Sequence, residues 1–304
     1  MANTQTPFQQ GAAFFPGKLR EILLAVDEVQ QREAEEIRLR AGKGLSILGA
    51  DGRETVLPGT AAISQQELRG VIEIATAASF HRAMDKLCRG YLPLAGGHRL
   101  GIAGSAVTRE GRIHHFRDLS SLSLRLAHEI SGAAFPVARQ LVAKGKRGGS
   151  CLILAPPGYG KTTLLRDLIR IYSDQWKLRV GVADERGEIA ALLDGVPQFA
   201  VGASVDVIDG CGKGEAGLLL LRSMNPQVIA MDEITSPEDV DALSVIAHCG
   251  TAVLATAHGS DLEALFRRPL YQPLLQQRIF QTVVSIRRTE GRRSSVVEET
   301  PCCT

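Results

Sequence analysis

A lysine and two threonines close a glycine-containing turn in the segment APPGYGKTT, at residues 155–163. Glycines let backbone N–H groups approach phosphate oxygens closely, and a helix that starts after such a turn adds its dipole. The Lys161 ammonium would neutralise phosphate charge, and the Thr162 hydroxyl is suited to binding Mg²⁺. We therefore predict a nucleoside triphosphate site at Ala155, Pro156, Pro157, Gly158, Tyr159, Gly160, Lys161, Thr162 and Thr163.

Ala155 departs from the phosphate-loop pattern G-x-x-x-x-G-K-[ST], whose first position is a glycine. The residue ends an apolar strand that begins at Cys151, and a methyl group is often harmless there. The alternative interpretation of the segment is a chance glycine turn before a helix. The pattern favours nucleotide binding over that alternative.

Carboxylates follow two further apolar strands. The segment PQVIAMDE ends in Asp232 and Glu233. Asp232 can hold Mg²⁺, and Glu233 can orient and polarise an attacking water. The group DERGE at 184–188 follows a strand at 179–183, and its Glu188 is a second candidate for activating water, with a solvated turn as the alternative. Because ligands of parallel sheets bind at the carboxyl ends of the strands, we expect these acids to face the phosphate loop.

A histidine ends another apolar strand, in the segment GTAVLATAHG at residues 250–259. This position would place the Thr256 hydroxyl and the His258 imidazole near the γ-phosphate, where His258 would sense phosphate by hydrogen bonding. A lone histidine is usually structural, and we interpret the earlier His248 as a surface residue of a helix.

The order of elements predicts two α/β domains, at residues 1–132 and 133–304. The first combines helices at 19–29 and 64–78 with strands at 36–40, 45–48, 54–57, 97–107 and 121–126. In the second, strands at 151–154, 179–183, 228–231, 252–257 and 282–287 alternate with helices, which implies a predominantly parallel sheet covered on both faces. Residues 132–150 predict a helix and then a basic connector, with nucleic-acid binding as the alternative for its charges. The stretch 209–217 is too glycine-rich for a rigid element, and whether it moves with nucleotide state, contacts a partner or is a mobile surface loop stays open.

Composition describes a soluble globular protein, with 44% hydrophobic and 22% charged residues in 304. The net charge of +2 gives no overall case for binding nucleic acid or an anionic membrane. No signal-peptide pattern begins the chain, and its apolar runs fall short of the roughly 20 residues that span a bilayer. We expect a cytoplasmic protein whose membrane role is peripheral. Cys302 and Cys303 are expected to be reduced and idle rather than metal ligands or a lipidation site.

The four motifs APPGYGKTT, DERGEIA, LRSMNPQVIAMDE and GTAVLATAHG, in this order, resemble the secretion-ATPase branch of the RecA-like P-loop fold. This branch contains the motors of type II and type IV secretion and of pilus systems. The first region narrows the resemblance, because EEIRLRAGK, GGHRLGIAGSAV and SSLSLRLAHEI are similar to the stage III sporulation AA family. The similarity extends from about Phe15 to Arg288, with Gly212 as a departure where the family would have proline.

The resemblance implies ATP and Mg²⁺ as cofactors, ATP hydrolysis, and a hexameric ring of identical subunits. It also implies that arginines of the first domain reach the nucleotide at a subunit interface, and Arg99 and Arg125 match that pattern. Ordinary strand-surface arginines are the alternative for both, and Arg38 and Arg40 are weaker candidates. Arg222 is expected to pair with the acidic group at Glu185 or Glu188.

The leading hypothesis is therefore an ATP-hydrolysing motor that powers or assembles a sporulation channel complex. The implied partners are membrane-embedded sporulation channel proteins between mother cell and forespore, with the motor on the mother-cell side and no nucleic acid expected. Two rival hypotheses are a nucleic-acid-associated ATPase and a scaffold that binds ATP without hydrolysing it. Open at this point are the transported substrate, the ring size, the identity of the membrane partner and the choice between Glu233 and Glu188 as main base.

Overall fold

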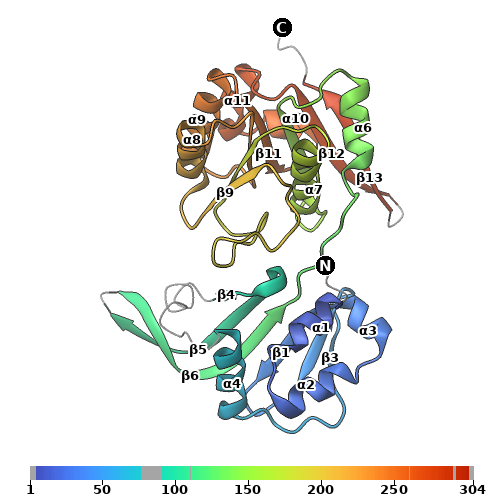
Figure 1. Ribbon diagram of the computed structural model, residues 1–304, viewed down its shortest axis with the longest axis vertical. Coiled ribbons are helices and arrows are strands. Elements are labelled where there is room, and N and C mark those ends of the chain that lie inside the picture. Colours follow the sequence, from blue (N-terminus) through green and yellow to red (C-terminus); the bar gives the residue numbers. More distant parts are fainter. Residues whose placement is uncertain (1–4, 77–90, 110, 260, 290–291, 301–304) are drawn as a thin grey trace. The chain divides into compact units, whose positions relative to one another are not determined.

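The computed structural model describes residues 5–76, 91–109, 111–259, 261–289 and 292–300. The chain divides into two compact units, residues 1–128 and 129–304 (Figure 1). This division lies close to the boundary that the sequence predicts at residue 132. Cys302 and Cys303 lie outside the described residues, as does Glu110 of the turn between the two long strands of the first unit.

The first unit is built on a six-stranded antiparallel sheet in the order β3-β2-β1-β6-β5-β4. Its strands are β1 Ala34–Arg40, β2 Ser46–Gly49, β3 Glu54–Val56, β4 Tyr91–Pro93, β5 Arg99–Arg109 and β6 Arg112–Arg125. Its α-helices are α1 Pro7–Ala12, α2 Gly17–Leu24, α3 Glu28–Glu33 and α4 Gln65–Ala75. Alternate residues of β1, such as Ile37 and Leu39, are buried on one face of the sheet. The other face of the sheet therefore remains open to polar residues.

Hydrogen bonds to capping side chains mark the starts of helices in this unit. The predicted capping box at α4 is confirmed, since Ser64 accepts from the Glu67 backbone N–H and the Glu67 side chain accepts from the Ser64 backbone N–H. The prediction of one helix over 19–29 was wrong. Asp27 starts a new helix there, because its carboxylate accepts from the backbone N–H groups of Val29 and Gln30.

The second unit contains a seven-stranded sheet in the order β13-β12-β7-β11-β10-β8-β9. Every neighbouring pair is parallel except β12 and β13, so the predicted α/β class with a predominantly parallel sheet is confirmed. The strands are β7 Cys151–Ala155, β8 Val180–Asp184, β9 Val205–Asp209, β10 Val228–Met231, β11 Ala252–His258, β12 Thr282–Thr289 and β13 Arg292–Glu299. The two edge strands, β9 and β13, were not predicted from the sequence.

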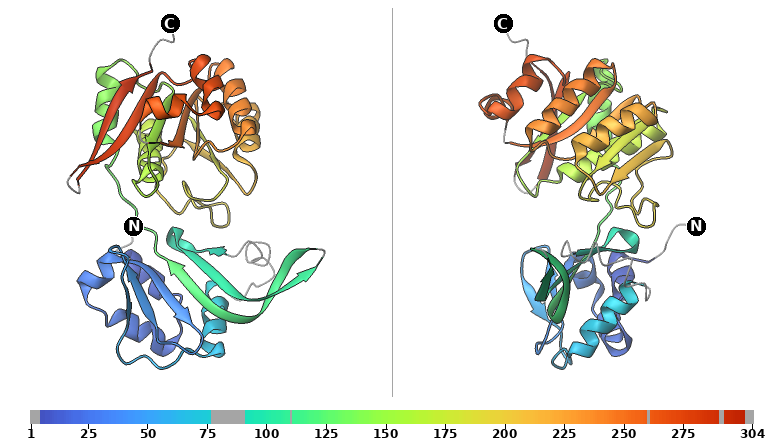
Figure 2. Two further views of the ribbon diagram at one scale, coloured as in Figure 1. Left: turned by 180° about the vertical axis from the view of Figure 1, so that it is seen from behind. Right: turned by 90° about the vertical axis from the view of Figure 1, so that its left-hand side faces the viewer.

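Helices cover both faces of this sheet, as expected for a parallel arrangement (Figure 2). On one face lie α6 Phe135–Ala143 and α7 Lys161–Asp174, packed on Ile153 and Ala155 of β7. On the other lie α8 Lys213–Ser223, α9 Pro237–His248, α10 Leu262–Phe266 and α11 Gln272–Gln276, packed on Leu152 and Leu154. His248 is exposed at the end of α9, as predicted.

The expectation that 209–217 forms no rigid element was wrong for its second half, because α8 begins at Lys213 and runs through Gly214 and Gly217. These glycines serve close packing instead. A Cβ at Gly214 would lie 3.0 Å from the Glu238 carbonyl oxygen, and one at Gly217 would lie 3.1 Å from Ile246 Cδ1. The helix therefore sits against α9 and the sheet at a distance that larger residues would prevent.

Among the helices in the described parts of the chain, none has both the length and the apolar character that crossing a bilayer requires.

Candidate functional site

The segment 155–163 forms a strand, a turn and a helix, with β7 ending at Ala155 and α7 starting at Lys161. Ala155 is buried and its side chain belongs to the core, which explains why a methyl group is accommodated where the pattern has glycine. Gly158 and Gly160 have φ angles of +76° and +85°, a region that strains any side chain with a Cβ. Among the residues that the structure describes, no side chain caps the start of α7, so its first backbone N–H groups remain available to an anion.

The Lys161 ammonium lies inside this turn and is largely buried. Its Nζ lies 3.0 Å from the Ala155 carbonyl oxygen, 3.2 Å from that of Pro156 and 2.8 Å from His258 Nδ1. Burial lowers the pKa of Lys161, against the nearby charges of Glu233 and Asp232, which raise it. Within the described residues no ion pair joins Lys161 to a carboxylate, so a phosphate would meet a buried and incompletely neutralised cation.

Asp232 follows β10 and is held between two hydroxyl groups. Thr162 Oγ1 donates to Asp232 Oδ2 at 2.8 Å, and Thr256 Oγ1 donates to Asp232 Oδ1 at 2.6 Å. A hydroxyl and a carboxylate oxygen beside a phosphate loop are the hard oxygen ligands that Mg²⁺ takes together with nucleotide phosphates. This donor set therefore fits a magnesium ion, supplied with its remaining ligands by phosphate and water.

Glu233 occupies a strained backbone position with a φ of +32°, which is unusual for a residue other than glycine. Its N–H donates to Thr256 Oγ1 at 2.9 Å, and its Oε1 lies 2.6 Å from His258 Nε2. His258 thus stands between Lys161 and Glu233, with one ring nitrogen toward each. A neutral imidazole fits both contacts, since Nδ1 can accept from the ammonium while Nε2–H donates to the carboxylate.

The acidic group after β8 divides into a structural and an accessible part. Asp184 is buried, and its carboxylate accepts the backbone N–H groups of Glu188, Ile189, Ala190 and Ala191. This fixes the loop so that Glu188 lines a small cavity together with Asp232 and Glu233. The cavity volume of about 20 Å³ is sufficient for one water molecule. The two candidate bases therefore line one space that is large enough for a single water molecule.

Two cations of this region were missed by the sequence analysis. Arg166, one helical turn after Thr162, donates to the carbonyl oxygens of Ile189 at 2.7 Å and Glu188 at 2.6 Å. Its guanidinium lies over the Phe199 ring, 3.6 Å from the centroid, and burial lowers its pKa. The spacing of four residues from Thr162 was the available signal, because such residues share a helix face.

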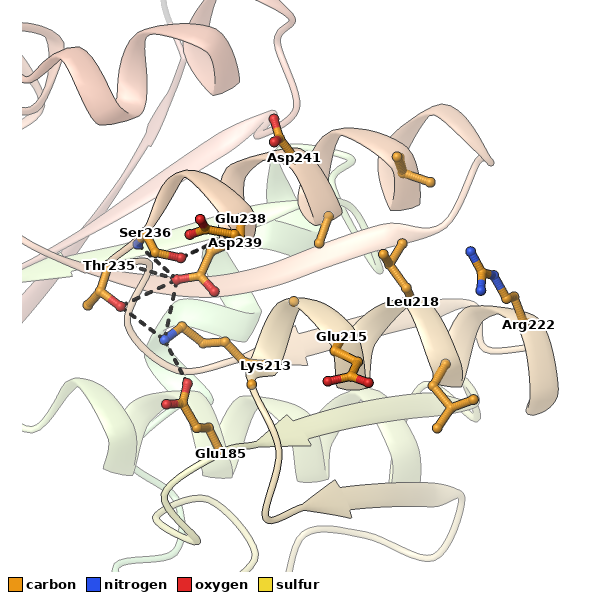
Figure 3. A pocket seen from close by; sticks show the side chains of 15 residues that line it. Glu185, Lys213, Glu215, Leu218, Arg222, Thr235, Ser236, Glu238, Asp239 and Asp241 are labelled. Atoms are coloured by element: carbon orange, nitrogen blue, oxygen red, sulfur yellow. Dashed lines mark hydrogen bonds and ion pairs between the residues drawn. The ribbon is translucent and has the colours of Figure 1, made fainter. Parts of the chain in front are cut away.

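Lys213 is the second missed cation. Its buried Nζ lies 3.1 Å from Glu185 Oε2, 3.3 Å from Asp239 Oδ2 and 3.1 Å from Thr235 Oγ1 (Figure 3). It lines the same small cavity as Glu233 and so connects the acidic loop to the start of α9. The expected pairing of Arg222 with Glu185 or Glu188 was wrong, because within the described residues no ion pair involves Arg222. Glu185 pairs instead with Lys213 at the first turn of α8, while Arg222 lies in the last turn.

The predicted arginines lie in the first unit, on neighbouring strands. Arg99 and Arg125 are directly opposite each other in the β5–β6 ladder, and Arg125 is opposite Glu36 in the β1–β6 ladder. The Arg99 guanidinium also lies over the Tyr91 ring, 5.3 Å from its centroid. Arg38 and Arg40 are ion-paired with Glu36 and Glu54 within the same sheet. The structure thus groups the arginines with one another but in a different unit from the phosphate loop.

Comparisons with known proteins agree with this arrangement. Residues 8–298 match the family model described as sporulation stage III, protein AA. The chain is 34% identical over 284 residues to stage III sporulation protein AA of Bacillus subtilis, which covers 92% of this chain and 91% of that protein.

Two solved structures show the fold. The crystal structure of the pilus retraction motor PilT with bound ADP aligns with a TM-score of 0.62 at 16% identity, over 91% of this chain and 83% of that one. The ATPase DotB of Legionella pneumophila aligns with a TM-score of 0.57 at 17% identity, over 89% and 77% of the two chains. The fold is therefore the RecA-like P-loop fold of secretion ATPases.

Proposed function

This chain belongs to the family of sporulation stage III protein AA, and we propose that it is a magnesium-dependent ATPase acting as a motor of a sporulation channel complex. One observation carries the proposal. The phosphate-loop lysine, the Thr162–Asp232 pair and the Glu233–His258 pair form one connected set around the loop. This set contains the cation, the metal ligands and the base that phosphoryl transfer to water requires.

Each residue has a role that follows from its position. The N-terminal amides of α7 and the Lys161 ammonium bind the β- and γ-phosphates, and phosphate oxygens replace the Ala155 and Pro156 carbonyls as partners of Lys161. Thr162 and Asp232 hold Mg²⁺, which when bound neutralises charge on the transferred phosphoryl group.

Glu233 orients the attacking water and accepts its proton, with Glu188 on the other side of the same small cavity. His258 bridges Glu233 and Lys161, so a γ-phosphate that draws Lys161 away removes the donor to His258 Nδ1. In this way His258 senses the γ-phosphate. Arg99 and Arg125 complete the site of a neighbouring copy in a homo-oligomeric, hexameric ring and stabilise transition-state charge there.

The family assigns the chain to sporulation, and the remaining parts of the proposal follow from that setting. The motor acts in the cytoplasm on the mother-cell side and associates peripherally with membrane-embedded channel proteins. Nucleic acid is not a partner in this proposal. A tagged chain purified from membranes of sporulating cells should bring these channel proteins with it, and their absence would contradict the partner assignment.

Hydrolysis is tested with the Lys161→Ala variant of the full chain. The wild type should release phosphate from ATP in the presence of Mg²⁺ and not after chelation, and Lys161→Ala should lower this rate at least about 10³-fold. Lys18→Ala, at an exposed lysine of α2, is the matched control and should retain the wild-type rate. Wild-type turnover by Lys161→Ala would end the catalytic assignment.

A further inference from the structure

A groove of about 710 Å³ lies between α8 and α9 (Figure 3), and it adjoins the small cavity beside Glu233 because Glu185 and Lys213 line both. Apolar side chains of both helices line its middle. Leu219 of α8 is 51% exposed and Val245 of α9 is 48% exposed, with Leu218 beside them. Apolar residues that are grouped in one hollow with polar residues around them are a pattern of protein interaction sites.

Acidic side chains surround this apolar middle. Glu215 of α8 and both Glu238 and Asp241 of α9 line the groove, and within the described residues none of the three has an ion pair. The buried Lys213 is already paired with Glu185 and Asp239, so it does not neutralise them. The exposed Arg222 also lines the groove and offsets one of these three charges, so the groove keeps a net negative charge. The groove therefore favours a partner that presents basic and apolar side chains together.

The same unit carries a surface of that composition on α6 and the residues after it. Residues 132–150 contain Arg139, Lys144, Lys146 and Arg147 and no acidic residue. On α6, Phe135 is 45% exposed and Val142 is 51% exposed, and Arg139 between them is also exposed. Positions 135, 139 and 142 share one helix face, and the exposed Lys144 follows as the residue that caps the C-terminal end of α6. The α6 face, defined as these four residues, is therefore both apolar and basic.

The groove and the α6 face cannot meet within one copy. Helix α6 packs on one face of the sheet and contacts β13 at one edge. Helices α8 and α9 pack on the opposite face, where α8 contacts β8, β9 and β10 toward the other edge (Figures 1 and 2). Each copy thus presents one acidic groove and one basic helix face on opposite sides, which is the arrangement of a head-to-tail contact between identical subunits.

We propose that the α8–α9 groove of one copy binds the α6 face of a second copy of this chain. Charge complementarity is the argument for this occupant, together with the matching apolar residues on both surfaces. The inference deepens the proposed function, because it names the surfaces through which the subunits of the proposed ring assemble.

Charge reversal of each surface tests the contact. We would measure self-association of the full chain by sedimentation velocity, without nucleotide, for Arg139→Glu/Lys144→Glu and for Glu215→Lys/Asp241→Lys. Each pair should raise the dissociation constant at least about tenfold, because like charges then face each other across the contact. The chain with all four substitutions should recover to within about threefold of the wild type, since opposite charges face each other again.

Matched controls carry the same charge changes elsewhere. Lys18→Glu/Arg20→Glu and Glu21→Lys/Glu73→Lys alter exposed residues of α2 and α4 and should self-associate as the wild type does. Far-ultraviolet circular dichroism would confirm that every variant is folded.

Several outcomes would overturn the inference. They are a wild type that stays monomeric, a groove variant or an α6 variant that assembles normally, and a folded fourfold variant that does not recover. Loss of assembly in the groove variant alone would mean that a surface other than α6 of the second copy fills the groove. The outcome is separable from hydrolysis, because Lys161→Ala should assemble like the wild type even if no ATPase activity is found in either.

Discussion

The two units place their charged residues differently. In the second unit the phosphate loop, Asp232 and His258 all lie at the carboxyl ends of parallel strands, so residues far apart in sequence converge. In the first unit Glu36, Arg125 and Arg99 form a row across three antiparallel strands, each opposite the next. Parallel sheets gather side chains at one end, whereas antiparallel ladders spread them over a face.

The difference extends to how charge is compensated. In the first unit the Arg40 hydrogen bond, with that of Ser46, lowers the pKa of Glu54 to about 2, so this pair is locally satisfied. By contrast, the partners of Lys161 in the second unit are two carbonyl oxygens and an imidazole, which carry no full negative charge. Like charges directly opposite in a ladder are unfavourable, and the Arg99–Arg125 pair is such a case. Glu36, which is opposite Arg125 on the other side, offsets part of this repulsion.

The largest expected effect is that of removing Arg125, and this change tests whether the first unit contributes to catalysis at all. Arg125→Ala should lower ATP turnover about 10³-fold, as removal of an arginine that stabilises transferred phosphoryl charge does. Mixing Arg125→Ala subunits with Glu233→Gln subunits should restore part of the activity, because composite sites then hold both groups. Arg117→Ala, at an exposed arginine of β6, is the control. A mixture no more active than its components would show that Arg125 does not act across an interface.

The convergence at strand ends could largely be predicted from the sequence. Asp232 and His258 each come at the end of a largely apolar run, and Glu233 is next to Asp232, so a local pattern gives both the strand and the polar residues at its end. The phosphate loop is equally local. In parallel sheets ligands bind at the carboxyl ends of the strands, and this general rule was enough to predict that these residues lie close together.

The residues that the sequence did not indicate depend on packing between distant segments. Lys213 stands among glycines that suggest a loop, and only the close approach of α8 to α9 makes it a buried ion-pair partner. Strand β13 is rich in arginine, serine and glutamate and pairs only at the sheet edge, where burial does not enforce an apolar pattern. Tertiary contacts decide such positions.

A second prediction compares ion pairs of the two units. Lys213→Met should lower the free energy of unfolding by about 3 kcal/mol, because it leaves the buried Asp239 without its cation. Arg32→Met, which breaks the exposed Arg32–Glu28 pair of the first unit, should cost less than about 1 kcal/mol. Urea unfolding measures both. Adding Asp239→Asn to Lys213→Met should recover part of the loss, and equal effects of the two single variants would contradict the assignment of Lys213 as a buried partner.

The third prediction distinguishes the two carboxylates at the small cavity. Glu233→Gln should keep ATP binding and lower turnover about 10²-fold, the range for loss of a general base. Glu188→Gln should lower turnover less, because Glu233 would still hold the water. Fluorescent-nucleotide titration and single-turnover hydrolysis separate binding from chemistry. The reverse order of the two effects would assign the base to Glu188.

The smallest expected effect is a pH dependence of the stability of the first unit. In the first unit burial lowers the pKa of His98 to about 4, with the charge of His128 as a smaller cause. His98 Nδ1 accepts the Ala127 backbone N–H at 3.0 Å, and within the described residues its Nε2 has no hydrogen-bond partner. The folded state therefore holds this imidazole neutral.

Because this pKa lies below the value of about 6.5 in an unfolded chain, the unfolded state takes up the proton first as the pH falls. The contribution of neutral His98 to the free energy of unfolding is fully present above pH 6.5 and is lost toward pH 4. Between pH 7.5 and pH 5 this contribution falls by about 2 kcal/mol. Hydrogen exchange at the two pH values should show the first unit opening more readily at the lower one. In His98→Asn, whose amide oxygen can still accept from Ala127, this difference should disappear. A variant with an unchanged pH response would show that other groups of the unit carry it.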